Sequence, residues 1–428
     1  MLHSYTCRVD ADALAAFCAL EAGFTDQFVY YRKDRPFRYL GLGRCIALRS
    51  LDEEDARLEG PDTGHEPVLF SFRPFDAGRR GDAGGADAGA GGLADDLMDA
   101  FPNLSWMLPE IVVIEDETGT FLQVNSLSPV RAARVERFLR RVEGAAAPAR
   151  ADVPVTVEAD DPAAWEGEVA RAQAAIADGA VEKVVLARRL RVSAARPFSA
   201  RDLVVNLALG GAVGTVVAYR YADVFFCGCT PELLVRKRAG AVESMCLAGT
   251  CPRGADAASD ERLAAELLAD HKNRAEHEYV VGFMRAAFGR LCHGVEIPAA
   301  PGILKLAHVQ HLHTPVRARV LDGVTLEGLV EGLQPTPAVS GAPVGEAKML
   351  IRSIEPAPRG LYAGACGVAT TAGDGEFSVA LRTGVFDGES GWAYAGCGIV
   401  AESDAAAEYD ETDAKLKTIL SAFDGVTR

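Results

Sequence analysis

Several features are missing from this sequence of 428 residues, and each absence narrows what the chain can be. No stretch approaches about 18 uninterrupted apolar residues, the length that a membrane-crossing helix needs, so we expect no membrane span. The ten cysteines include no Cys-x-x-Cys pair, and the first residues, MLHSYTCRVDADALAAF, lack a basic segment followed by an apolar one. We therefore expect reduced thiols and a cytoplasmic protein. Neither G-x-G-x-x-G nor G-x-x-x-x-G-K-[ST] opens a helix, so nothing supports a nucleotide cofactor.

Positive charge is also in short supply. The chain has 44 Lys and Arg against 60 Asp and Glu, a formal net charge of −16. Such a surface repels phosphate backbones and anionic lipid headgroups, which argues against nucleic-acid and membrane partners. It would repel a small anionic substrate as well, so a site for one must contain local cations or a divalent metal ion.

The order of predicted elements favours an α+β fold. Residues 1–150 form a strand-rich N-terminal region, in which residues 75–92, rich in Gly, Ala and Asp, read as a mobile surface loop. An Ala/Pro-rich connector over residues 134–154 separates this region from residues 151–428. Because strands and helices mix without strict βαβ alternation, we expect antiparallel sheets with helices outside them.

The second region has clearer signals. A helix runs from Asp161-Pro162 to Gly179, and the last helix begins near Asp404. A single long helix is expected over residues 260–291. Strands are predicted over 182–192, 224–237 with a break at Thr230-Pro231, 242–254 and 308–320, and a hairpin over 375–400.

Charged side chains on the two long helices could hold a metal ion. Glu408, Glu411 and Lys415 are spaced i, i+3 and i+7 on the last helix, and Asn273 and Glu276 are one turn apart on the long one. If the helices meet, these oxygens suit Mg²⁺, which takes one or two carboxylates and keeps waters. The alternative is a solvated helix face with a Glu411–Lys415 ion pair.

Three other residues admit two interpretations each. Lys183 is either a solvated strand lysine or a general base, and Glu232 is either an acid in an apolar pocket or a turn residue. Arg382 lies within the apolar run FSVALRT, where a buried guanidinium needs an anion from the protein or from a substrate. The histidines within 308–313 are expected to be structural, since their side chains cannot all converge on one metal.

A series of short motifs between residues 183 and 417 makes the sequence recognisable: KVVLARR, TPELLVR, LAGTCPRG, AEH, QPTPAVSG, YAGACG, VALRT, AGCGIV and EYDETDAK. In this order they resemble the chorismate-utilising enzymes, and most closely the isochorismate synthases. The resemblance implies one large anthranilate synthase component I-like α+β unit, with two antiparallel sheets sandwiched, helices outside and the active site between the sheets. The N-terminal third matches only in strand character and length.

The resemblance also implies roles for individual residues. Lys183 matches the general base and Glu232 the general acid. Glu276 and Glu411 match the ligands of a Mg²⁺ cofactor, with Glu408 beside them as a contact through water. The remaining matches are substrate contacts: Gly249, Thr250, Ala338, Tyr362, Arg382, Gly396 and Lys415.

The implied activity is that of an isomerase, which converts chorismate to isochorismate by attack of water at C2 and loss of the C4 hydroxyl. A salicylate synthase, which goes on to eliminate pyruvate, and a catalytically silent chorismate-binding protein stay open as alternatives. Lys183 argues against the ammonia-using relatives, which typically lack this base. Two departures stand out, since many relatives have histidine where Gln334 stands and an acid where Asn273 stands. The product could feed menaquinone or siderophore synthesis, and we expect a monomer or weak homodimer.

Overall fold

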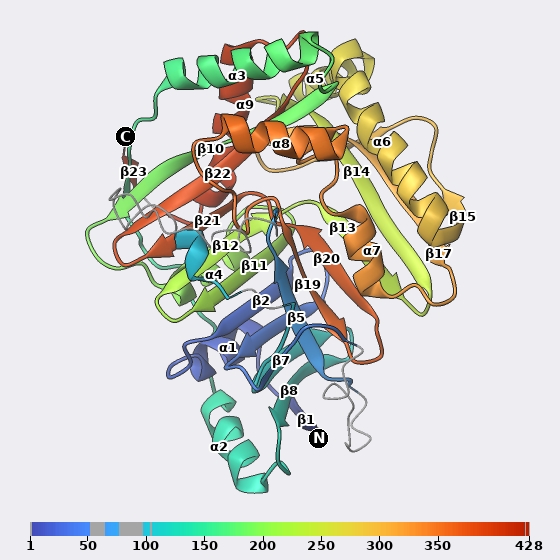
Figure 1. Cartoon of the computed structure of the whole chain (residues 1–428). Helices are drawn as coiled ribbons and strands as arrows, with labels where there is room; N and C mark the ends of the chain where they lie inside the picture. The colour runs from blue at the N-terminus through green and yellow to red at the C-terminus, as the bar shows by residue number, and fades with distance from the viewer. Residues whose placement is uncertain (1, 52–64, 77–96, 103–104, 424, 428) are drawn as a thin grey trace, which may run out of the picture.

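The computed structural model describes residues 2–51, 65–76, 97–102, 105–423 and 425–427 (Figure 1). Residues 77–92 of the predicted surface loop lie outside this part of the chain. No helix within it combines the length and the apolar character that crossing a membrane requires.

Two large sheets, in which nearly every neighbouring pair of strands is antiparallel, form the framework. The larger sheet has the order β1-β8-β7-β3-β2-β11-β12-β21-β22-β10-β9-β23, with β18 also on β10. Its strands are β1 His3–Val9, β2 Gln27–Arg32, β3 Arg38–Leu42, β7 Ile111–Asp116, β8 Gly119–Ser126, β9 Val155–Val157, β10 Lys183–Ala194, β11 Thr215–Tyr221, β12 Val224–Thr230, β18 Gly341–Ala342, β21 Thr383–Asp387, β22 Ser390–Ile399 and β23 Val426–Thr427. Among the described strands, β9 and β23 are the one pair that runs parallel.

The smaller sheet has the order β15-β17-β14-β13-β20-β19-β5-β6-β4, with β16 also on β17. Its strands are β4 Ile46–Leu48, β5 Val68–Arg73, β6 Trp106–Leu108, β13 Leu233–Arg238, β14 Ala241–Pro252, β15 Cys292–Glu296, β16 Gly302–Lys305, β17 Val309–Val320, β19 Ala365–Thr370 and β20 Gly375–Val379. Both sheets take strands from before and after residue 150, so the N-terminal region is built into the same sandwich.

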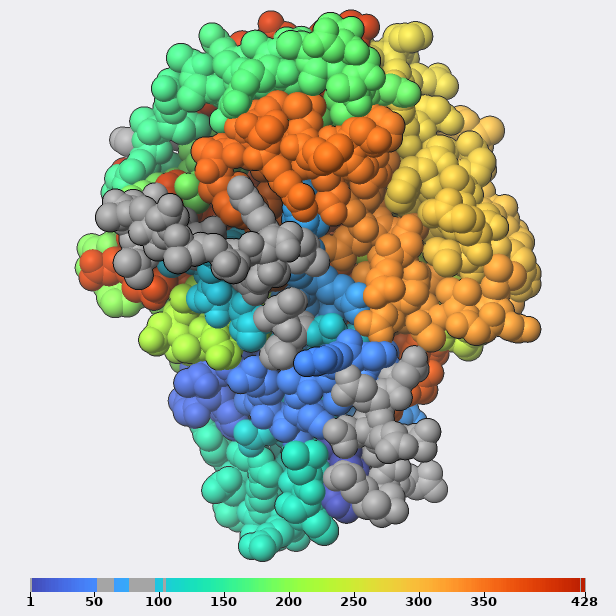
Figure 2. Space-filling model, viewed as in Figure 1, coloured from blue at the N-terminus to red at the C-terminus, as the bar shows by residue number. Residues whose placement is uncertain are grey.

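Helices cover the outer faces of this sandwich. They are α1 Ala13–Leu20, α2 Ala132–Val142, α3 Pro162–Ala177, α4 Ala200–Leu209, α5 Ala257–Ala269, α6 His271–Leu291, α7 Leu326–Leu333, α8 Val344–Ile354 and α9 Ala405–Leu420, with a 3₁₀ turn at Leu97–Ala100. Helix α6 packs on β14 and α9 on β22, and Figure 2 shows α3, α6 and α8 at the surface of the upper half. One apolar core fills the space between the sheets and continues beneath α3, α6, α7 and α8. A second lies between the larger sheet and α1, α2, α4 and α9. The predicted α+β sandwich is confirmed.

Two of the points at which the chain passes between the sheets lie side by side. Strand β12 ends at Thr230 in the larger sheet and β13 begins at Leu233 in the smaller one, so the predicted break at Thr230-Pro231 is confirmed. The expected single hairpin over 375–400 was wrong in its first arm, because β20 lies in the smaller sheet and β21 in the larger. The second crossing contains Arg382, whose φ of +55° turns the backbone.

The two crossing segments are hydrogen-bonded to each other. The Val379 amide donates to the carbonyl of Glu232 at 3.0 Å, and the Cys229 amide donates to the carbonyl of Arg382 at 3.4 Å. The Thr230 hydroxyl donates to the Val379 carbonyl at 2.5 Å. Glu232 and Arg382 are therefore placed side by side by the topology.

The single helix predicted over 260–291 was wrong, because α5 ends at Ala269 and α6 begins at His271. Asp270 is extended (ψ 122°), and its side chain accepts the Asn273 amide at 2.8 Å as an N-cap. An aspartate in a helical pattern is also a helix start signal, and here the cap outweighs helix continuation.

We expect Gly228→Ala to destabilise the fold. A Cβ at residue 228 would lie 2.4 Å from the Arg382 carbonyl oxygen and 2.6 Å from Thr383 Cα, both backbone atoms that cannot move aside. Overpacking of this kind costs about 1–3 kcal/mol of unfolding free energy. Denaturant unfolding measures it, with Gly282→Ala on α6 as control, where a Cβ meets nothing within 4 Å. Equal stability of both variants would contradict the close approach.

Candidate active site

One cavity between the sheets collects most of the residues singled out from the sequence. It measures about 540 Å³, including its opening to solvent. The smaller sheet supplies lining residues from β14 and β17, and the larger sheet supplies them from β10 and β22. The predicted site residues that line it are Glu232, Gly249, Thr250, Glu276, Ala338, Tyr362, Arg382, Gly396 and Lys415.

Lys183 is buried beside this cavity. It is the first residue of β10 and its exposed fraction is 0%, so the interpretation as a solvated lysine was wrong. Its Nζ lies 3.0 Å from Oε1 of Glu276 on α6. Burial would raise the pKa of Glu276, but attraction to Lys183, Lys415 and Lys272 outweighs this and lowers it. The Glu276 carboxylate is therefore held ionised against a buried ammonium.

A glycine makes room for this ion pair. A Cβ at Gly398 would lie 2.4 Å from Glu276 Oε1 and 2.8 Å from Lys183 Cε. Our reading of the sequence selected Gly396 from AGCGIV and missed Gly398. The two glycines alternate along β22 and so share a face, which is the signal that could have found the second one.

Glu232 follows the first crossing and is 4% exposed. Burial raises the pKa of its carboxyl to about 7, although Arg382, Lys183 and Lys415 act in the opposite direction. Desolvation of the charged form dominates, so the group carries its proton to an unusually high pH. A carboxylic acid that is protonated near neutral pH can donate a proton to a leaving group.

Arg382 is 5% exposed and faces the same cavity from the second crossing. Its Nη2 contacts His311 Nε2 at 3.3 Å, and within the described part of the chain no carboxylate lies within 4.0 Å of its guanidinium. Burial lowers the pKa of Arg382, the expected result for a desolvated cation without an ion-pair partner. Of the two predicted sources of an anion, this geometry favours a ligand.

His311 lies in the cavity wall, where the sequence interpretation did not place it. Burial lowers its pKa well below the usual value, with Arg382 and Lys415 adding to the effect. A guanidinium can only donate, so Nε2 accepts and the proton sits on Nδ1, which is 3.0 Å from the Thr250 hydroxyl and 3.3 Å from the Gly249 carbonyl. The neutral ring thus connects Arg382 to Thr250.

Gly249 and Thr250 lie at an irregularity of β14, where the register to β17 shifts between Ala248 and Thr250. Gly249 has a φ of +78°, which only glycine adopts readily. The Thr250 amide, freed from the ladder, donates to Asn273 Oδ1 at 3.0 Å, and Asn273 Nδ2 donates to Asp270 at 2.7 Å. A carboxylate at 273 could not donate to Asp270, which explains in physical terms the amide found there.

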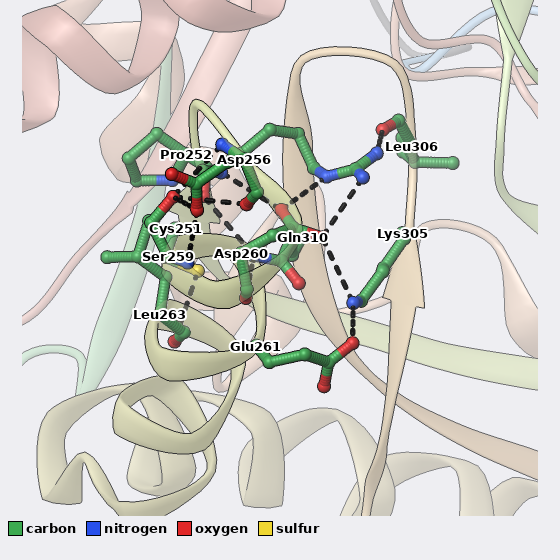
Figure 3. Close-up of polar contacts among 12 residues, drawn as sticks. Cys251, Pro252, Asp256, Ser259, Asp260, Glu261, Leu263, Lys305, Leu306 and Gln310 are labelled. Atoms are coloured by element: carbon green, nitrogen blue, oxygen red, sulfur yellow. Dashed lines mark hydrogen bonds and ion pairs between the residues drawn. The ribbon is translucent and has the colours of Figure 1, made fainter.

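The end of β14 beyond Thr250 is held by a polar cluster (Figure 3). Asp260 on α5 accepts Arg253 Nε at 2.7 Å and the Gly254 amide at 2.9 Å, and pairs with Lys305 Nζ at 3.0 Å. Gln310 Nε2 donates to the Asp260 carbonyl at 3.2 Å. These contacts join β14, α5 and the β16–β17 hairpin and so fix the segment that carries Thr250.

Three carboxylates from α6 and α9 are each paired with a lysine; Glu276 lines the cavity, whereas Glu408 and Glu411 are not among its lining residues. Besides Lys183–Glu276, the Lys415 Nζ lies 2.5 Å from Glu411 Oε1, and Lys272 Nζ lies 2.6 Å from Glu408 Oε1. The predicted Glu411–Lys415 pair is therefore present, but Lys415 is buried and not on a solvated face. The described residues contain no preformed cluster of three or more His, Cys, Asp or Glu ligands. Two hard carboxylates with water fit Mg²⁺, which needs no larger protein ligand set.

The remaining predicted contacts complete the wall. The Tyr362 and Tyr394 rings stack at 5.2 Å, and Lys415 Nζ donates to the Gly396 carbonyl at 2.9 Å. Gln334 is not among the lining residues, and its Nε2 donates to the Pro74 carbonyl at 2.8 Å. The departure at residue 334 therefore lies outside the cavity wall.

The proton on Glu232 makes stability depend on pH. The folded protein holds this proton up to about pH 7, whereas an ordinary glutamic acid releases it near pH 4.5, so the native state loses stability as pH rises through that window. Glu232→Gln removes this loss. We expect the variant to gain up to roughly 3 kcal/mol relative to the unsubstituted protein between pH 5 and 8, measured by denaturant unfolding. If the unfolding free energies of the variant and the unsubstituted protein change with pH in the same way, the raised pKa of Glu232 is contradicted.

Comparison with known proteins gives a consistent family. The sequence profile of the family described as chorismate binding enzyme matches residues 1–424. Isochorismate synthase MenF of Bacillus subtilis is 38% identical over 264 residues, covering 62% of this chain and 56% of that protein. The salicylate biosynthesis isochorismate synthase of Pseudomonas aeruginosa is 40% identical over 290 residues, covering 67% and 59%. The matches thus span less than two thirds of either relative's length.

Solved structures agree on the fold. The menaquinone-specific isochorismate synthase MenF from Escherichia coli has a TM-score of 0.80 at 23% identity, covering 99% of this chain and 94% of that one. Anthranilate synthase component I from Streptococcus pneumoniae has a TM-score of 0.68 at 21% identity, covering 97% and 92%. At these identities the likeness concerns the sandwich alone.

Proposed function

The chain belongs to the chorismate binding enzyme family, and we propose that it is a Mg²⁺-dependent isochorismate synthase. The observation that carries the proposal is that a buried lysine, Lys183, and a protonated buried acid, Glu232, occur together at one cavity. The same cavity contains an arginine, Arg382, that has no carboxylate partner among the described residues. The names of the Bacillus and Pseudomonas relatives support the same reaction.

The reaction exchanges one hydroxyl for another across the chorismate ring. Lys183 acts in its neutral form, after giving its proton to solvent: the free amine accepts a proton from water as the water oxygen bonds to C2, and the ring double bonds shift. Glu232 gives its proton to the C4 hydroxyl, which departs as water. One water is consumed and one released, so the product is an isomer, and the two residues exchange their protons with solvent afterwards.

The charges in the cavity support the need for a metal ion. The three lysines and Arg359 are each offset by a carboxylate, Glu232 is protonated and His311 is neutral. Among the described residues at the cavity, Arg382 therefore remains as the cation available to a dicarboxylate. Mg²⁺ held by Glu276 and Glu411, with Glu408 contacting it through water, would supply the missing positive charge for the ring carboxylate. Arg382 and Lys415 would orient the substrate, and Ala338, Tyr362 and the Gly249–Thr250 segment would enclose it.

Incubating the pure protein with chorismate and Mg²⁺ and separating the ring products tests the proposal. Isochorismate as the product supports it. Salicylate and pyruvate formed without a second enzyme would show a salicylate synthase instead, and unchanged chorismate would show a silent binding protein.

Lys183→Ala is expected to lower kcat by about 10²–10⁴-fold, because water then lacks the group that accepts its proton. Chorismate binding should persist, since Arg382 and Lys415 are untouched. Steady-state kinetics and calorimetry measure the two effects, with the exposed Lys417→Ala as the matched control. Full activity in Lys183→Ala would refute the assigned role.

Glu276→Gln should weaken Mg²⁺ binding by at least about 10-fold and chorismate binding with it, because the amide loses the charge that attracts the ion. Magnesium titration of the initial rate and calorimetry with Mg²⁺ give the two values. Glu278→Gln, two residues further on and exposed, is the control. If the metal-free enzyme keeps its full rate in the presence of a chelator, a catalytic role for Mg²⁺ is excluded.

A further inference from the structure

Strand β10 loses its partner on one side where it enters the active site. Strand β18 pairs with Lys183 and Val184, and the Val185 amide still donates to the Ser340 carbonyl at 2.8 Å. Beyond that point the segment before β18 turns away. The Val185 carbonyl and the Ala187 amide then face a gap on that side of β10, because alternate residues of a strand point their backbone groups to the same neighbour.

A buried ion pair fills this gap in place of a strand. Arg359 Nη2 donates to the Val185 carbonyl at 2.7 Å, and Glu355 Oε1 accepts the Ala187 amide at 2.9 Å. The Arg359–Glu355 pair measures 2.5 Å, with side chains 3% and 5% exposed. Across the gap, Arg359 Nη1 donates to the Val339 carbonyl at 2.6 Å, and the Phe75 ring lies 4.5 Å from the guanidinium carbon. One guanidinium therefore bridges the two diverging segments.

The two diverging segments that Arg359 bridges, at Val185 and Val339, form a fork that is part of the cavity wall. Val185, Ala338, Val339 and Arg359 itself line the cavity, and Lys183 stands two residues before Val185. We propose that Arg359, held by Glu355, is a positioning residue that sets the separation between the strand carrying Lys183 and the segment carrying Ala338. The inference rests on the proposed function, in which Lys183 must face a ring seated against that segment.

Arginine suits this position for a geometric reason. Its planar guanidinium directs separate N–H groups to one carboxylate and two carbonyls at once, whereas the single ammonium of lysine cannot reach all three in one plane. Arg359→Lys therefore keeps the charge opposite Glu355 but loses at least one of the two carbonyl contacts. The fork should widen or shift while the carboxylate-binding residues stay in place.

The test compares Arg359→Lys with Arg38→Lys, which alters a 2.5 Å Arg38–Glu115 ion pair between β3 and β7, strands that contribute nothing to the cavity wall. Arg359→Lys should lower kcat between about 10- and 100-fold, the effect of displacing a reacting group by a fraction of an ångström to an ångström. The dissociation constant of chorismate, measured by calorimetry in a Lys183→Ala background, should stay nearly unchanged. The control should keep its kcat.

Hydrogen exchange followed by mass spectrometry gives a readout independent of turnover. A peptide spanning residues 184–190 should exchange faster in Arg359→Lys than in the unsubstituted protein and in the control. If Arg359→Lys does not fold, Glu355→Gln, which keeps an oxygen for the Ala187 amide and loses the charge that holds Arg359, is measured in the same way and should show the same kcat loss.

The outcomes separate the two proposals. A folded Arg359→Lys with the kcat of the unsubstituted protein, or with unaltered exchange over 184–190, overturns the positioning role. An unsubstituted protein that binds chorismate without converting it overturns the proposed function, and the exchange comparison then still decides whether Arg359 holds the fork.

Discussion

The pairing of two crossing segments between the sheets is the constraint on which the site depends. Chain segments that pass from one sheet to the other leave their ladders and expose backbone groups, which would be costly in a buried interior. Here the backbone groups of the segments around Glu232 and Arg382 hydrogen-bond to each other: the Val379 amide donates to the Glu232 carbonyl, and the Cys229 amide donates to the Arg382 carbonyl. The acid and the arginine are consequently adjacent because of how the sheets are connected, and both line the cavity.

The electrostatics of the cavity follow from burial more than from net charge. A protein of −16 places five cations in or beside one small space, Arg359 among them, yet four of them are paired with a carboxylate each. Removing either partner of such a pair would leave a desolvated charge, so the pairs persist as units. Arg382 differs because its nearest polar side-chain contact is a neutral imidazole, which accepts a hydrogen bond but offers no charge. The cavity is thus nearly neutral overall while one cation remains available to a ligand.

The sequence predicted element identities and the break at Thr230-Pro231 well, but it missed two other breaks. Strand β10, helix α3 and helix α9 were confirmed within a residue or two because caps, proline and apolar alternation agree there. The break at Asp270 was missed because a local cap on the Asn273 amide outweighs an otherwise continuous helical pattern. The sheet change before Thr383 was missed because it is decided by a long-range contact, the pairing of one crossing segment with another. His311 was read as structural for a similar reason, since alternation along a strand cannot tell which residue faces a cavity made by two sheets. The roles of the site residues were reached through family resemblance, and the structure adds their proximity.

Glycines on β22 show why propensity alone would mislead at such a site. Glycine is unfavourable inside a strand, so the segment AGCGIV predicts a strand only weakly. Strand β22 nevertheless runs through this segment to Ile399. A Cβ at Gly396 would lie 3.1 Å from the Tyr362 hydroxyl, and one at Gly398 would lie 2.4 Å from Glu276 Oε1. Both residues therefore leave space for polar groups that come from other elements. Alternate glycines in a central strand need an explanation when neither a bulge nor a sheet edge accounts for them. They indicate that side chains from another element approach that face of the sheet. Here the approaching group at Gly398 is the ion pair between Lys183, the proposed base, and Glu276.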